Sequence, residues 1–177
     1  MASVFGHFAA AAALGAGLFP KQTRTATVLL AGACACVPDL DVLAFRFDIP
    51  YHSEWGHRGW THSLLFAAVF GWSAAWAFFR RMEDFQRIAL WCMLSVASHP
   101  LLDMLTNGGK GVALFFPVDN SRLFFPFRPI QVSPLGVSRF FSSWGLEVLA
   151  SEMLWIGLPC LGLIAISRMS KHLRREV

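Results

Sequence analysis

The residues best suited to chemistry lie in one short stretch, from His57 to Ser63. It holds two imidazoles, one guanidinium and two hydroxyl groups, and a long apolar run begins directly after it. Ionisable groups are costly within apolar membrane segments and usually have a function there. Other ionisable residues interrupt apolar segments in the same way, namely His7, Asp39, Asp41, His99 and Asp103.

Imidazoles and carboxylates in this arrangement predict a metal site. His99 and Asp103 are four residues apart, so on a helix both project from one face and can share an ion. His57 and His62 cannot share one regular helical face. A loop ligand followed by a ligand at a helix start would still bring both to one site.

The number and type of the donors point to more than one ion. Asp39 and Asp41 are two residues apart, so Pro38 and the turn geometry must aim both at the site, or one of them orients another ligand. The predicted metal ligands are His7, Asp39, Asp41, His57, His62, His99 and Asp103, which are too many for one tetrahedral ion. Two ions about 3.5–4 Å apart would use them and would suit phosphoester hydrolysis. The donors indicate one to three divalent ions, most simply Zn, with Mn or Fe as alternatives.

The predicted catalytic residues are Arg58, His57 and Thr61. A bound metal lowers the pKa of water from ~15.7 towards ~7 and so supplies hydroxide at neutral pH. Arg58 would bind phosphate oxygens, because a guanidinium pairs with them bidentately. Thr61, Ser63 or Thr106 could add hydroxyl hydrogen bonds. His57 could be a metal ligand or a general acid, and the sequence leaves both roles open.

Each polar group also has a simpler structural interpretation. His7 could be a helix-packing residue, the two aspartates could form a helix C-terminal turn, and His99 with Asp103 could bridge helices by a hydrogen bond. Two rival functions follow, a metal-ion transporter and a structural protein whose helices are joined by metal. The inner halves of the apolar segments show no ladder of ionisable residues, which favours a one-sided site over a transport path.

The composition places these groups in an integral membrane protein. Of the 177 residues, 55% are hydrophobic and 15% charged, whereas soluble domains carry about 25% charged residues. The net charge of +4 arises from basic residues between apolar runs rather than from a stripe, so we expect no nucleic-acid partner. The four cysteines include no CxxC pair and are interpreted as small helix residues. Residues 1–177 are expected to form one membrane-embedded domain.

Five apolar segments approach the roughly 20 residues that a membrane-spanning helix requires. They cover residues 2–19, 26–47, 61–79, 88–105 and 146–167. Thr61 is expected to cap the third, and Pro100 to kink the fourth. Residues 106–143 are rich in Gly, Pro and Phe and predict a re-entrant or interfacial flap. The expected fold is all-α, a multi-pass transmembrane bundle of about five helices with this flap.

Basic residues predict the orientation of this bundle. Lys21 and Arg24, the turn 80–87 and the C-terminal tail fall on one side of a five-helix path, and the positive-inside rule makes that side cytoplasmic. The predicted metal ligands and the flap then share the periplasmic side. The path was derived from Lys and Arg alone, so this convergence of His and Asp independently supports one site.

The motifs resemble the YdjM-like inner-membrane proteins of bacteria, a family regarded as metal-dependent hydrolases. The resemblance rests on His7, Pro-Asp-Leu-Asp at 38–41, His-Arg-Gly-Trp-Thr-His-Ser at 57–63, Ser-His-Pro-Leu-Leu-Asp at 98–103, and Thr-Asn-Gly-Gly at 106–109 leading to Phe116-Pro117. It implies a metal-supported hydrolytic site, with a distant similarity to zinc-dependent phospholipase C. The ligands it implies are His7, Asp39, His57, His62, His99 and Asp103, with Asp41 as a further candidate.

The combined prediction is a hydrolase at the outer face of the bacterial inner membrane. Its substrate would be a phosphoester of a lipid or of another membrane-associated molecule, cleaved by a metal-activated water. Phe124 and Phe125 in the flap would offer an apolar wall for an acyl chain. The expected partners are the bilayer and this substrate, and the sequence leaves the oligomeric state open.

Overall fold

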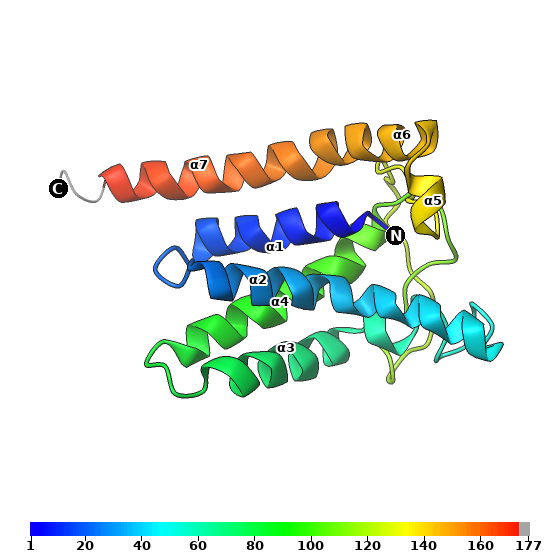
Figure 1. Ribbon diagram of the computed structural model, residues 1–177, viewed down its shortest axis with the longest axis horizontal. Helices are drawn as coiled ribbons and strands as arrows, with labels where there is room; N and C mark the ends of the chain where they lie inside the picture. Colours follow the sequence, from blue (N-terminus) through cyan, green and yellow to red (C-terminus); the bar gives the residue numbers. More distant parts are fainter. Residues whose placement is uncertain (174–177) are drawn as a thin grey trace.

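The computed structural model describes residues 1–173, apart from the side chains of Val137 and Lys171, and its architecture is all-α (Figure 1). The long helices are α1 (Val4–Leu18), α2 (Thr25–Cys36), α3 (Leu64–Phe79), α4 (Phe85–Met104), and a rod formed by α6 (Ser143–Glu152), the π-helical η3 (Met153–Gly157) and α7 (Leu158–Leu173). Shorter elements are the 3₁₀ helices η1 (Val37–Phe47) and η2 (Trp60–His62), and α5 (Val137–Phe140). In the described residues, β-structure is limited to two isolated bridges, Thr106 with Ile130 and Val112 with Leu123. The predicted all-α class is confirmed.

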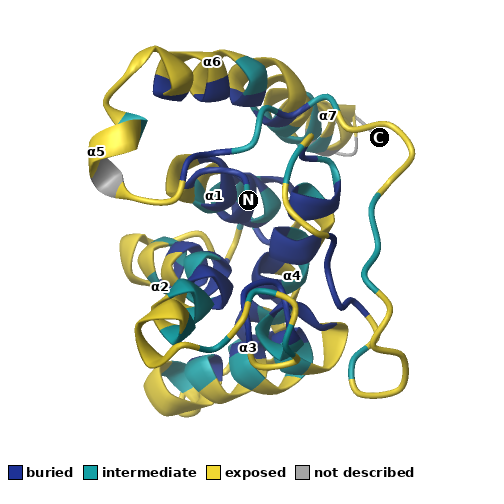
Figure 2. Ribbon diagram, turned by 90° about the vertical axis from the view of Figure 1, so that its right-hand side faces the viewer, coloured by how far each residue is buried: buried dark blue, intermediate teal, exposed yellow. Residues whose placement is uncertain are grey.

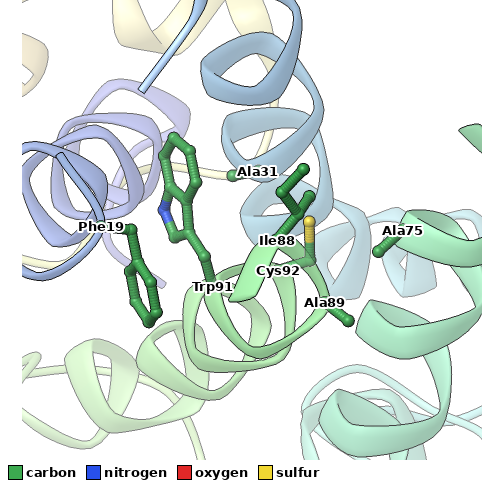
Figure 3. Close-up of a cluster of buried hydrophobic side chains, with 7 residues drawn as sticks. All are labelled: Phe19, Ala31, Ala75, Ile88, Ala89, Trp91 and Cys92. Carbon is green, nitrogen blue, oxygen red and sulfur yellow. The ribbon is translucent and has the colours of Figure 1, made fainter. Parts of the chain in front are cut away.

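Helix α4 lies at the centre of the bundle and contacts α1, α2 and α3. Its Trp91 is fully buried in a cluster with Phe19, Ala31, Ala75, Ile88, Ala89 and Cys92 (Figure 3). The helices approach closely because small residues face the indole: a Cβ on Gly15 would lie 2.0 Å from the ring. The indole N–H donates to the carbonyl of Ala11 at 2.9 Å. The packing around Trp91 therefore fixes the helices from which the predicted ligands project.

The helix ends gather at two opposite ends of the bundle (Figure 1). The α1–α2 and α3–α4 connections lie at one end, where Arg24 Nη2 is 3.9 Å from Asp84 Oδ2. The start of α1, the end of α4, and the segments η1 and η2 lie at the other end. Predicted ligands that are distant in the sequence are therefore carried to the same end of the bundle.

Two helical stretches are long and apolar enough to cross a membrane, Thr25–Phe47 and Ser143–Ser170. Helices α1 and α3 are apolar but shorter. The second stretch packs on α1 and exposes large apolar side chains such as Leu161 and Ile166. Much of its ribbon is coloured as exposed in Figure 2. An exposed apolar surface of this kind suits contact with lipid. Helices cover all five predicted segments, but five membrane crossings remain a prediction.

The start of α3 differs from the sequence prediction. Ser63, not Thr61, is the N-cap: its hydroxyl accepts a hydrogen bond from the N–H of Phe66 at 3.0 Å, and its backbone is extended, as an N-cap requires. Thr61 lies in η2, and its hydroxyl donates to Asp41 at 2.8 Å. The side chain of Thr61 thus belongs to the candidate site. Pro100, expected to kink α4, lies in a helix that continues to Met104.

Residues 106–143, the region predicted as a flap, form a folded cover over the end of the bundle that holds the predicted ligands (Figure 1). The cover is tied to α4 by backbone hydrogen bonds, from Ile130 N–H to the Leu105 carbonyl at 3.1 Å and from Phe125 N–H to the Met104 carbonyl at 3.1 Å. Ile130 is fully buried against Ala2 and Ala10. The position of the cover relative to a membrane remains a prediction.

Candidate metal centre

Four buried side chains meet beneath the cover. Asp39 comes from η1, His62 from η2, and His99 and Asp103 from α4, and one donor atom of each lies within 4.8 Å of the others. His62 Nε2 lies 3.1 Å from His99 Nε2 and 3.7 Å from Asp39 Oδ1. Asp39 Oδ1 is 3.3 Å from His99 Nε2, and Asp103 Oδ2 is 3.6 Å from His62 Nε2. Two imidazole nitrogens and two carboxylate oxygens thus share one small buried volume.

The spacing and chemistry of these four donors fit a metal ion. Ligands about 2.0–2.2 Å from a tetrahedral Zn²⁺ are separated by roughly 3.3–3.6 Å. The five separations that involve His62 or His99 run from 3.1 to 4.0 Å, and the two carboxylate oxygens lie within 4.8 Å of each other. Both oxygens of Asp39 and Oδ2 of Asp103 are buried and, within residues 1–173, lack a hydrogen-bond partner. Two such carboxylates repel each other unless a cation compensates their charge.

The rings of His62 and His99, whose Nε2 atoms face the cluster, are both held in place through Nδ1. His99 Nδ1 lies 2.7 Å from the carbonyl oxygen of Ala35, and His62 Nδ1 lies 3.1 Å from Asp41 Oδ2. A carbonyl and a carboxylate only accept hydrogen bonds, so each Nδ1 carries a proton, and each ring in its neutral form presents the lone pair of Nε2. Metal-binding histidines are commonly oriented in this way.

The 3₁₀ geometry of η1 aims Asp39 and Asp41 at opposite nitrogens of His62. Pro38 stands at the start of η1 and has no N–H to donate to the preceding turn. With about 3.0 residues per turn instead of about 3.6, side chains two residues apart diverge by about 120° rather than about 160°. Asp39 therefore reaches Nε2 while Asp41 reaches Nδ1. A regular α-helix at this point would have separated them further. The prediction that Pro38 and a local turn aim the two aspartates agrees with the 3₁₀ geometry.

His7 lies against the same four residues from α1. Its ring stacks on that of His99, with centroids 3.7 Å apart. Its Nε2 is 3.5 Å from Asp103 Oδ1 and 3.8 Å from Asp39 Oδ2. Each carboxylate thus presents one oxygen to the His62 side and the other to His7. In the described part of the chain, neither nitrogen of this fully buried ring has a hydrogen-bond partner.

Asp41 forms a second cluster with His57 and His62. Its Oδ1 lies 2.5 Å from His57 Nδ1, and its Oδ2 accepts from the backbone N–H of Arg58 at 2.9 Å and from the Thr61 hydroxyl at 2.8 Å. These donors engage much of the accepting capacity of the carboxylate. The geometry favours Asp41 as the group that orients the two imidazoles.

Arg58 is fully buried beside Asp103. Its Nε lies 3.0 Å from Asp103 Oδ2, although the N–H is not aligned for a hydrogen bond. Its Nη1 donates to the carbonyl of Gly108 and its Nη2 to the hydroxyl of Thr106, both at 3.0 Å. Every nitrogen group of Arg58 therefore has a protein neighbour. The phosphate-binding role predicted for it would require one of these partners to be displaced.

The sequence predictions omitted the contribution of Glu152 and the N-terminal segment. The backbone N–H of Ala2 donates to Asp103 Oδ1 at 2.7 Å. The N–H and hydroxyl of Ser3 both donate to the buried carboxylate of Glu152. The α6 helix thereby holds the segment that positions Asp103. An acidic residue inside an apolar segment was the signal that identified Asp39, and it would have identified Glu152 as well.

The loop that carries His57 is held by Arg122 from the cover. The guanidinium of Arg122 donates to the carbonyls of His57 and Ser53, both at 2.9 Å. Tyr51 packs edge-on against the His57 ring, with centroids 5.1 Å apart. Burial raises the pKa of Tyr51 above its usual value of about 10, so its hydroxyl stays neutral. His57 is therefore held in place by an aromatic ring, a carboxylate and a guanidinium.

Comparison with known proteins yields a relative and a family. The chain is 38% identical over 161 residues to the inner membrane protein YbcI of Escherichia coli (strain K12), a match that covers 90% of this chain and 92% of that protein. No solved structure matches the chain. The model of the family described as YdjM inner membrane protein matches residues 1–173, a range that includes every predicted metal ligand. The resemblance inferred from the motifs is thus confirmed, and the chain belongs to the YdjM inner membrane protein family.

Proposed function

We propose that this protein is a metal-dependent hydrolase of the bacterial inner membrane that cleaves a phosphoester in a lipid or another membrane-associated substrate. The proposal rests on one observation, a set of buried atoms that could bind metal and that form no hydrogen bond with the described residues. These atoms are both nitrogens of His7, both oxygens of Asp39 and Oδ2 of Asp103. Unpaired buried polar groups are unfavourable, and metal binding would satisfy the carboxylate oxygens and one nitrogen of His7, the one that carries its lone pair.

Asp39, His62, His99 and Asp103 would hold one ion. His7 would help to hold a second ion, together with the oxygens of Asp39 and Asp103 that face it. Mixed nitrogen and oxygen donors favour Zn, with Mn and Fe as alternatives. When bound, such ions lower the pKa of a water towards ~7 and stabilise negative charge on a phosphoryl group.

The protein residues around these donors provide orientation and charge balance. Asp41 keeps the Nδ1 proton on His57 and His62 and so fixes which nitrogen each ring presents. Arg58 offsets the charge of Asp103 in a position fully excluded from solvent. His57 lines a cavity of about 230 Å³ that opens beside the cluster. It is the group best placed to give a proton to a leaving oxygen there.

In this proposal the covered end of the bundle faces the periplasm and the C-terminus faces the cytoplasm. Support comes from the opposite end, where Lys21, Arg24 and Arg81 line one open cavity. Basic residues between apolar segments are retained on the cytoplasmic side. The donors would then meet substrates presented by the outer leaflet.

The first test of the proposal is the metal content of the purified protein. Detergent-purified, full-length protein prepared without chelators should contain about two transition-metal ions per chain by mass spectrometry. His62→Ala and His99→Ala should lose metal. His52→Ala is the matched control, because His52 is an exposed loop histidine. A wild-type protein without metal would overturn the proposal.

The second test is turnover in a membrane. Metal-loaded wild-type protein in liposomes should release a phosphorylated headgroup or phosphate from phospholipid, and His99→Ala should not. Metal flux into proteoliposomes without hydrolysis would support a transporter instead. Retained metal with neither activity would support a structural role for the ions.

A further inference from the structure

The cavity beside His57 lies between the loop of Tyr51 and the last part of the cover, residues 132–139, together with Trp144 of α6. The residues that matter for its chemistry are Tyr51, His57, Gly109, Leu135, Arg139 and Trp144. We propose that this cavity binds the headgroup of an anionic phospholipid and that Arg139 selects its charge. This inference rests on the proposed hydrolase function and specifies its substrate.

The charges around the cavity favour an anion. Among the described side chains that line it, Arg139 is the permanently charged one and none is a carboxylate. A second cation lies close by, since the Nζ of Lys110 is 5.7 Å from the centre of the Tyr51 ring. A choline or ethanolamine headgroup would bring its ammonium beside these cations without a carboxylate to pair with. A headgroup with net negative charge meets no such penalty.

Arg139 differs from the other arginines near the site because its charge is uncommitted. Arg58 faces Asp103, and Arg122 donates to three backbone carbonyls. The exposed guanidinium of Arg139 has no ion pair or hydrogen bond with any residue that the structure describes. A free guanidinium at the wall of a cavity can bind phosphate oxygens bidentately.

The shape of the cavity suits a headgroup rather than a whole lipid. Its volume of about 230 Å³ lies below the range of about 300–1,000 Å³ that is usual for pockets of drug-sized ligands. Trp144 forms a fixed wall, because its indole N–H donates to the carbonyl of Val132 at 2.9 Å. Leu135 and Pro134 extend this wall with apolar surface. The apolar wall suits the glyceryl ester region, while the acyl chains would remain outside.

The cavity is also adjacent to the predicted metal ligands. His57 lines it and binds Asp41 through Nδ1 at 2.5 Å, and Asp41 in turn contacts His62. Gly109 provides a close approach on the same side: a Cβ there would lie 2.9 Å from the Tyr51 hydroxyl and 2.6 Å from Arg58 Nη1. Contacting side chains therefore connect the cavity to the donor cluster, His57 with Asp41 on one path and Arg58 behind Gly109 on the other.

Binding can be measured apart from turnover. Full-length protein in detergent is titrated calorimetrically with cleavage-resistant phosphonate analogues of dihexanoyl phosphatidylglycerol and dihexanoyl phosphatidylcholine, both below their micelle concentrations. Wild type should bind the phosphatidylglycerol analogue at least about ten-fold more tightly than the phosphatidylcholine analogue. Arg139→Gln should lose this preference, and Arg139→Lys should keep part of it. Arg128→Gln is the matched control, because Arg128 lies in the cover but over the ring of Phe124, at 4.7 Å.

The outcomes separate this inference from the hydrolase proposal. Equal binding of the two lipids by wild type, or an unchanged preference in Arg139→Gln, would overturn the inference even if lipid is cleaved. The expected preference without cleavage by the metal-loaded protein would retain the cavity as a lipid site and overturn the hydrolase. Glycerol 1-phosphate carries the charge without acyl chains. Binding of it as tight as that of the lipid would overturn the assignment to a lipid.

Discussion

The Nε2 atoms of His62 and His99 lie 3.1 Å apart, while both rings are anchored through Nδ1. Because Asp41 and the Ala35 carbonyl hold the Nδ1 protons, two neutral rings would direct their Nε2 lone pairs at each other in a buried space. A hydrogen bond between the rings would require one of them to be doubly protonated. A shared cation makes the same geometry favourable with both rings neutral, which is the form that binds metal.

Asp41→Asn should weaken metal binding without removing metal ligands. The amide cannot hold the Nδ1 proton of His62 as firmly as the carboxylate does, so affinity should fall by about 10–100-fold while stoichiometry at saturation is unchanged. Competition with a chromophoric chelator measures both quantities. Asp48→Asn, in an exposed position just after η1, is the control. Loss of a whole ion in Asp41→Asn would show instead that Asp41 is itself a ligand.

Removal of metal should destabilise the folded protein. A ligand present at 100 times its dissociation constant adds about 2.7 kcal/mol to stability. A chelator should therefore lower the Tm of wild type and of His52→Ala, and zinc should restore it. The Tm of His99→Ala should respond much less, because a ligand is missing. A Tm of wild type that is insensitive to the chelator would contradict the metal site.

Arg58→Met should reduce stability strongly. Removal of one partner from a buried ion pair costs about 3–5 kcal/mol, because the other charge remains buried. In this protein the remaining charge is Asp103, which is fully buried. Thermal unfolding in detergent measures the loss, with Arg139→Gln as an exposed control. If Arg58→Met unfolds at the wild-type temperature, the contact with Asp103 does not stabilise the fold.

Phe125 and Phe124 should have different effects on lipid turnover. Phe125 lines an apolar groove of about 290 Å³ between α1, α4 and α7, whereas the ring of Phe124 lies 5.9 Å from the guanidinium carbon of Arg58. Fully burying an exposed Phe side chain contributes about 1.5–3 kcal/mol. Phe125 is partly exposed, so an acyl chain would bury only its remaining surface, and Phe125→Ala should lower kcat/KM for long-chain phospholipids by up to about ten-fold. Short soluble substrates should be little affected. Phe124→Ala should impair both, and equal losses in Phe125→Ala would argue against a lipid substrate.

Features that depend on local sequence were predictable. The lengths of the apolar runs indicated the helices, and the positions of Lys and Arg predicted which helix ends lie together. His7, Asp39, His62, His99 and Asp103 stood out because charged and imidazole groups are rare in apolar segments. The family could be recognised from the same residues. The predicted N-cap of α3 was wrong. Thr61 and Ser63 are both residue types that cap helices well, but the hydroxyl of Thr61 donates to Asp41, and Ser63 caps the helix.

The pairing of these residues was decided only by the tertiary structure. The sequence presents Arg58 as a free cation and Asp41 as one more ligand, but packing directs Arg58 at Asp103 and places Asp41 between His57 and His62. Glu152 acts on the site through Ser3, across 149 residues of sequence. A residue's type and spacing determine which chemistry it can perform. Its partner and its burial depend on which distant segments pack against it, and this is a property of the folded chain alone.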